Sequence, residues 1–126
     1  MHQSEINIQI TLDDEKMPET IRWQAPDGGV DGWQDAKGML LNLWDGQEKS
    51  ALRIDLWTKK MMVDEMADFF YQSMMGMADT YNRATRNTAL ANEMKAYAKT
   101  FHKKAIDALN EEMKKQEGGE SEDGSR

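Results

Sequence analysis

The chain has 126 residues, which suits one domain with a single core. Its 39% hydrophobic and 31% charged residues are typical of a globular protein, and its net charge of −7 argues against nucleic acid or anionic membranes as partners. The absence of cysteine excludes a disulfide framework and a thiolate site. No signal peptide or apolar run of about 20 residues is visible, so we expect a cytoplasmic protein without membrane insertion.

Two alternating segments open the chain. Residues 4–12 place isoleucine or leucine at every second position from Ile6 to Leu12, which predicts a strand with one wet face. Residues 21–25 alternate in the same way and predict a second strand. We expect a turn that contains Pro18 between them, and Gly28 and Gly29 predict a loop after the second strand.

Residues 39–45 and 51–57 predict two further strands, joined by a turn at Asp45 and Gly46. The linker 31–38 reads as a loop that could hold a helical turn. Short connections between successive strands favour a four-stranded antiparallel meander. The side chains expected to face inward are Ile6, Ile8, Ile10, Leu41, Ile54 and Leu56.

Two long helices are predicted after the strands, over about 63–86 and 88–115. Apolar residues recur at steps of three and four in both segments, as on one face of a helix. The second helix would be about 40 Å long, longer than a core of this size, so it overhangs or packs on another subunit. We therefore predict one α+β domain over 1–116, with both helices packed on one face of the sheet, and an acidic disordered tail over 117–126.

No residue cluster predicts catalysis, a cofactor or a metal site. His2 and His102 are the only histidines, and neither has a second ligand at metal-site spacing. The segment that starts at Asp27 resembles a calcium loop only faintly, because Gly38 stands where a bidentate glutamate is needed. The sequence thus predicts a protein that is not an enzyme and has no cofactor.

Two apolar sets are candidate interfaces. Leu40, Trp44 and Trp57 share the outer face of the second hairpin, where either the loop 31–38 or another protein could cover them. A methionine stripe on the first helix consists of Met66, Met74, Met75 and Met77, and it is either core or an adaptable binding groove. Met66, Met74 and Met77 are its candidate interface residues.

Several segments resemble the GldC family of gliding motility proteins of Bacteroidetes. The residues that carry the likeness are Ile21-Arg22-Trp23 with Asp27-Gly28-Gly29, Leu52-Arg53-Ile54-Asp55-Leu56-Trp57, Val63-Asp64-Glu65-Met66 with Phe69-Phe70, and Met77-Ala78-Asp79-Thr80. The resemblance covers about Ser4 to Phe101. It implies a small cytoplasmic accessory protein of the gliding machinery, and it supplies no catalytic motif.

The predicted order of strands, helices and acidic tail is also similar to the export chaperone SecB, although fold alone does not fix function. The leading hypothesis is an interaction protein of the gliding machinery, and the alternative is a SecB-like holdase or adaptor for secreted gliding components. A small-ligand-binding protein or an enzyme is a third class. We also expect a homo-oligomer, a dimer by default, that buries the outer face carrying Trp44 and Trp57.

Overall fold

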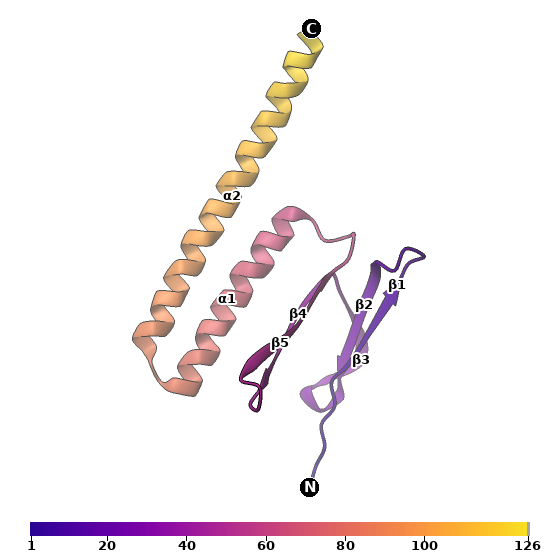
Figure 1. Ribbon diagram of the computed structural model, residues 1–126, viewed down its shortest axis with the longest axis vertical. Coiled ribbons are helices and arrows are strands. Elements are labelled where there is room, and N and C mark those ends of the chain that lie inside the picture. Colours follow the sequence, from indigo (N-terminus) through magenta and orange to yellow (C-terminus); the bar gives the residue numbers. More distant parts are fainter. Residues whose placement is uncertain (126) are drawn as a thin grey trace. The chain divides into compact units, whose positions relative to one another are not determined.

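The computed structural model describes the backbone of residues 1–125 and the side chains of residues 1–116 (Figure 1). The chain is α+β, with five strands and a short 3-10 turn before two helices. It divides into two compact units, a sheet unit, Met1–Met61, and a helix unit that begins at Met62.

The first three strands form one antiparallel sheet in the order β1-β2-β3. They are β1 (Asn7–Leu12), β2 (Pro18–Ala25) and β3 (Val30–Ala36), with the 3-10 turn Pro26–Gly28 between β2 and β3. The register places Ile10 opposite Ile21, and Ile21 opposite Ala36. Ile21 is only 2% exposed, so the middle strand carries the core of this sheet.

The opposite face of this sheet is organised by Arg22 in the middle strand. Its guanidinium donates a hydrogen bond of 2.9 Å to Gln9 Oε1 on β1 and lies 5.1 Å from the ring centroid of Trp33 on β3. Asp35 lies directly opposite Arg22 in the register. The Arg22 side chain therefore contacts both neighbouring strands, through a hydrogen bond to β1 and a ring contact on β3.

The second sheet is a hairpin of β4 (Gly38–Asp45) and β5 (Ser50–Trp57). Asp45 Oδ1 accepts the backbone N–H groups of Gln47 and Glu48 in the connecting turn. At the other end, Thr58 donates both its N–H and its hydroxyl to the Lys37 carbonyl oxygen, at 2.8 and 3.1 Å. Thr58 is 2% exposed, so a buried polar contact ties the end of β5 to the start of β4.

The predicted single meander of four strands is wrong, because five strands form a three-stranded and a two-stranded sheet. The strand that was missed is β3, which occupies most of the linker 31–38. Its sequence holds Gly32 and two aspartates, which are rare in strands, and it lacks apolar alternation. This strand forms because it pairs with β2, and its own sequence carries no local pattern that predicts a strand.

The helix unit contains α1 (Val63–Thr85) and α2 (Thr88–Ser125). Glu65 Oε1 accepts the Met62 N–H at 3.2 Å and caps the start of α1. Arg86 adopts a left-handed φ of 57° and ends that helix. Asn87 Oδ1 then accepts the Leu90 N–H at 3.1 Å, so asparagine caps the start of the second helix.

The two helices pack side by side (Figure 1), and buried alanines form the seam between them. The buried side chains of the pair are all small: Ala67 and Ala78 on α1, and Ala91 and Ala98 on α2. The backbone of α2 runs past the start of α1 and further than the predicted end near 115. Side chains of the predicted tail, 117–126, lie outside the described residues, and packing of the helices on a sheet stays a prediction.

Candidate protein-interaction surfaces

One side of the helix pair is polar. His102 Nε2 lies 2.7 Å from Asp68 Oδ1, and its ring lies 4.7 Å from that of Tyr71. Further along, Lys95 Nζ lies 2.6 Å from Asp79 Oδ1. These contacts join α1 to α2 through exposed or half-exposed side chains, so they fix the alignment of the helices more than they stabilise them.

Across the alanine seam from these polar contacts lies an apolar groove. It has a volume of about 330 Å³ and is open to solvent. Its walls come from both helices: Val63, Met66, Ala67 and Phe70 on α1, and Phe101, Ala105, Ala108, Leu109 and Glu112 on α2. Phe70 and Phe101 remain 39% and 40% exposed.

The groove follows from the sequence period of each helix. Val63, Met66 and Phe70 recur at steps of three and four, and the α2 residues of the groove do the same. Alanine at the seam lets the helices approach, while the larger side chains beside it form the walls. Glu112 is the single ionisable side chain in the lining. Such a groove can accept apolar side chains of a polypeptide segment, with Glu112 available to a basic neighbour.

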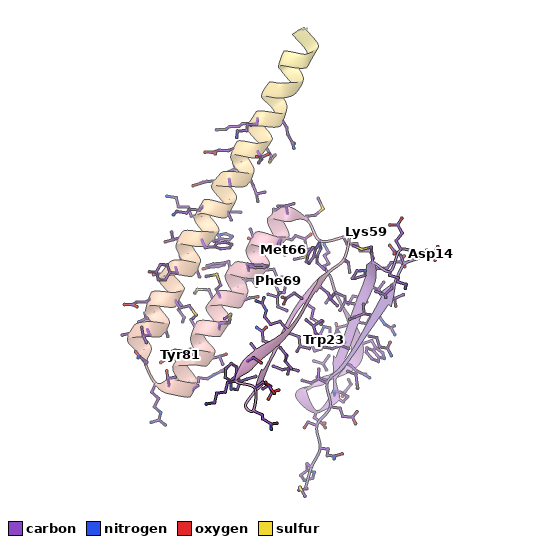
Figure 2. All side chains as sticks on the ribbon, viewed as in Figure 1. Asp14, Trp23, Lys59, Met66, Phe69 and Tyr81 are labelled. Carbon is purple, nitrogen blue, oxygen red and sulfur yellow. The ribbon has the colours of Figure 1, made fainter. Side chains whose placement is uncertain are left out.

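The predicted methionine stripe shares this face of α1, and its members differ in exposure. Met66 lines the groove, Met74 is half-buried, and Met77 is 54% exposed. Figure 2 places Met66 near the start of α1 and Tyr81 toward its end. The stripe therefore continues the apolar surface along the helix, beyond the groove itself.

The outer face of the β4–β5 hairpin carries the predicted tryptophan set. Residues directly opposite in an antiparallel pair share a face, and the register places Trp57 opposite Gly38 and Trp44 opposite Ala51. Trp44 is 70% and Trp57 58% exposed, while Leu40 is half-buried. The segment 31–38 is mostly strand β3 of the other sheet, and it leaves both tryptophans accessible.

The other face of the hairpin carries apolar side chains from both strands, and only Asp45 and Ser50 beside the turn are polar on it. The apolar residues are Met39, Leu41, Leu43, Leu52, Ile54 and Leu56. Leu52 and Ile54 are 56% and 50% exposed. Of the residues predicted to face inward, Ile6, Ile10 and Ile54 are exposed, whereas Ile8, Leu41 and Leu56 are half-buried. Cover of this face by the helices stays a prediction. A two-stranded ribbon has too little surface to bury its own apolar face.

A second hollow, of about 330 Å³, lies in the sheet unit and is the more polar one. Its ionisable lining residues are Glu19, Asp35, Lys37 and Lys60, and all of them are exposed. Within the part of the chain that the structure describes, no three His, Asp or Glu side chains gather where they could hold a metal ion. No described helix has the length and apolarity to cross a membrane.

Comparison of the sequence with known proteins identifies the family of the chain. No curated protein and no solved structure matches it. Residues 18–107 match the family described as gliding motility-associated protein GldC-like. This range contains β2 to β5, all of α1 and the groove-forming part of α2 up to Ala105. Because the match spans well over half of the chain, the protein belongs to the GldC-like family of gliding motility-associated proteins.

Proposed function

We propose that this protein is a non-catalytic accessory component of bacterial gliding motility that binds protein partners in the cytoplasm. Membership of the GldC-like family supports the role in motility. The observation that carries the binding mode is the open apolar groove between α1 and α2. Apolar side chains left exposed at a concave surface favour contact with another polypeptide.

The chemistry of the groove defines the partner segment. Phe70 and Phe101 offer exposed ring surface, and Met66 can adapt its shape to different apolar side chains. Glu112 favours a basic residue at the edge of the segment. The matching ligand is an amphipathic segment of a gliding-machinery protein or a secreted gliding component, with apolar residues on one face and lysine or arginine beside them.

A holdase for unfolded secreted proteins is the second candidate, favoured by the exposed apolar face of the hairpin around Leu43, Leu52 and Ile54. The two functions differ in specificity. A defined partner saturates the groove at a fixed stoichiometry, whereas a holdase suppresses aggregation of many unrelated unfolded chains. Light scattering of a heated model client, with and without this protein, separates them.

The proposed lack of catalysis rests on the placement of the ionisable residues. The polar hollow brings together Glu19, Asp35, Lys37 and Lys60, but all four side chains are solvated. A general acid or base is normally tuned by burial or a close neighbour. These exposed groups favour a surface role.

The groove is tested by placing one charge inside it and the same charge outside it. Phe70→Lys puts an ammonium group in the groove, while Gln72→Lys adds it two residues away, about half a turn around α1. In a gliding strain that lacks its own copy, F70K should fail to restore gliding and Q72K should restore it, at equal protein levels. Full motility with F70K would contradict the groove as the binding site.

A further inference from the structure

The outer edge of β5 is an open strand edge. The second sheet contains only β4 and β5, so β5 bonds to β4 on one side, and no described strand pairs with its other side. Over Ser50–Trp57 the register shows no bulge, and the sequence holds no proline. Proteins usually protect such edges with bulges, prolines or repelling charges, because a regular edge pairs readily with another strand.

The side chains of β5 divide cleanly between its two faces. Leu52, Ile54 and Leu56 lie on the apolar face, and Arg53 and Asp55 lie on the outer face. Arg53 Nη2 lies 2.9 Å from Asp55 Oδ2 within the chain, and both side chains remain accessible to solvent. Thus the open edge displays one positive and one negative charge, two residues apart.

We infer that this edge is a self-association site, where β5 pairs antiparallel with β5 of a second copy about a two-fold axis through Ile54. This register sets Arg53 opposite Asp55 of the second copy, and Asp55 opposite its Arg53. It also sets Leu52 opposite Leu56 on the apolar face. Both charge pairs are complementary, and the apolar faces of the two hairpins become one continuous four-stranded surface.

Registers whose axis lies at a position adjacent to Ile54 are worse. An axis through Arg53 places two arginines opposite each other, and an axis through Asp55 places two aspartates opposite each other. An axis between two residues sets polar side chains against apolar ones, because a one-residue slip exchanges the faces. The charges and the alternation of β5 therefore select the same register.

The other edge strands lack this self-complementarity. β1 and β4 carry no pair of opposite charges to fix a register. On β3, the centred antiparallel pairing would set Asp31 opposite Asp35 of the second copy, and two such repulsive pairs would form. Among the edge strands of the described residues, β5 is the one whose charges attract its own copy.

This site differs from the dimer through the outer face that the sequence predicts. Edge pairing joins the main chains of two β5 strands, and Trp44 lies on β4, away from the paired edge. Packing of two outer faces against each other would instead bury Trp44 and Trp57 together. It also lies outside the groove, whose walls are helical. Loss of self-association would therefore leave the proposed partner binding untouched, and the two proposals fail separately.

Charge exchange between two full-length variants tests the pairing. Asp55→Arg sets arginine against arginine in its own dimer, and Arg53→Asp sets aspartate against aspartate. Each variant alone should dimerise about tenfold or more weakly than the unaltered chain. Mixing them should restore the dimer, because every opposed pair becomes complementary again. Mixing leaves each chain's internal contacts unchanged, so a merely structural role of Arg53 or Asp55 predicts no recovery.

Matched controls carry the same charge changes in the hairpin turn, with Glu48→Arg and Lys49→Asp. Each control should dimerise like the unaltered chain in sedimentation equilibrium. All four variants keep a net negative charge, since the unaltered chain carries −7, so general attraction does not explain recovery on mixing. The proposal is overturned if the unaltered chain stays monomeric up to about 300 μM, if D55R and R53D still dimerise, or if their mixture does not recover.

The register is tested separately by disulfide crosslinking, because the chain has no cysteine of its own. Ile54→Cys should crosslink to its own copy under mild oxidation, since opposed Cβ atoms lie about 5 Å apart. Leu52→Cys should not, because its own counterpart lies about 13 Å away along the strand at about 3.4 Å per residue. L52C mixed with Leu56→Cys should crosslink. Equal crosslinking of I54C and L52C would overturn the register.

Discussion

The two units bury different kinds of side chain in their interiors. In the helix unit, the fully buried side chains are alanines, and the large apolar residues line a groove beside the seam. In the sheet unit, the buried side chains are Ile21 and the polar Thr58, and each serves one sheet or its connection. Close helix approach thus stabilises one unit, whereas the other depends on a single core strand and a few specific polar contacts.

The unfolding of each unit can be followed separately, because tryptophans and tyrosines lie in different units. All four tryptophans, Trp23, Trp33, Trp44 and Trp57, lie in the sheet unit, and all three tyrosines lie in the helix unit. Tryptophan emission therefore reports on the sheets, while the far-ultraviolet circular dichroism at helical wavelengths reports mainly on α1 and α2.

The largest effect is expected from a charge placed in the alanine seam. Ala98 is 0% exposed, so Ala98→Glu buries a carboxylate with no partner and should cost about 3 kcal/mol or more of unfolding free energy. Ala96→Glu is the control, since Ala96 is exposed on the same helix. In urea, the helical signal of A98E should be lost well before that of A96E.

The tryptophan emission of A98E sharpens the comparison. If the sheet unit has its own core, the midpoint from tryptophan emission should shift less than the midpoint from circular dichroism. Equal shifts of both midpoints would show that the units unfold as one, and would contradict the separate interiors described above.

A smaller effect is expected at the polar tie between the hairpin ends. Thr58→Val keeps the shape of the side chain but removes the hydroxyl that donates to the Lys37 oxygen. The loss should be about 0.5–1.5 kcal/mol, visible in tryptophan emission during urea unfolding. Thr11→Val on exposed β1 is the control. An unchanged midpoint for T58V would mean that the backbone N–H of Thr58 suffices.

The smallest effect concerns the turn after β1, and it depends on pH. Asp13 Oδ1 accepts the N–H groups of Met17 and Glu15 at 2.9 Å each, and Oδ2 lies 3.2 Å from Lys59 Nζ. The Met17 hydrogen bond, followed by the contacts with Lys59 and Glu15, lowers the pKa of Asp13 below its ordinary value of 3.8. A lowered folded pKa means that the ionised form stabilises the fold above the unfolded pKa and loses this role as pH falls through the folded one.

Replacing Asp13 tests this assignment. Asp13→Asn should reduce stability slightly near pH 7 and should flatten its decline below about pH 4, because the substituted side chain no longer titrates. Thermal unfolding at pH 3, 4 and 7 gives the comparison with the unaltered chain. Asp14→Asn, one residue on, is the control, and an identical pH profile for D13N and the unaltered chain would refute the role of Asp13.

Local patterns in the sequence were enough to predict the helices, the hairpin turn and most of the candidate interfaces. Steps of three and four place Val63, Met66 and Phe70 on one face whatever lies nearby, and caps such as Asn87 are local in sequence. The family match to GldC-like proteins likewise rests on sequence alone. In the same way, the outer face of the hairpin was predictable from the alternation around Trp44 and Trp57.

Which strands pair, and which side chains the helices bury, depends on contacts between residues far apart in the chain. β3 forms because β2 supplies hydrogen-bonding partners and Arg22 of β2 contacts the Trp33 ring. Such non-local pairing leaves no periodic signal in the strand itself. The helical period places alanines and aromatic residues close together on one face of each helix. Where α1 and α2 approach each other closely, there is room only for small side chains. The alanines therefore became the seam, while Phe70 and Phe101 were left at the groove.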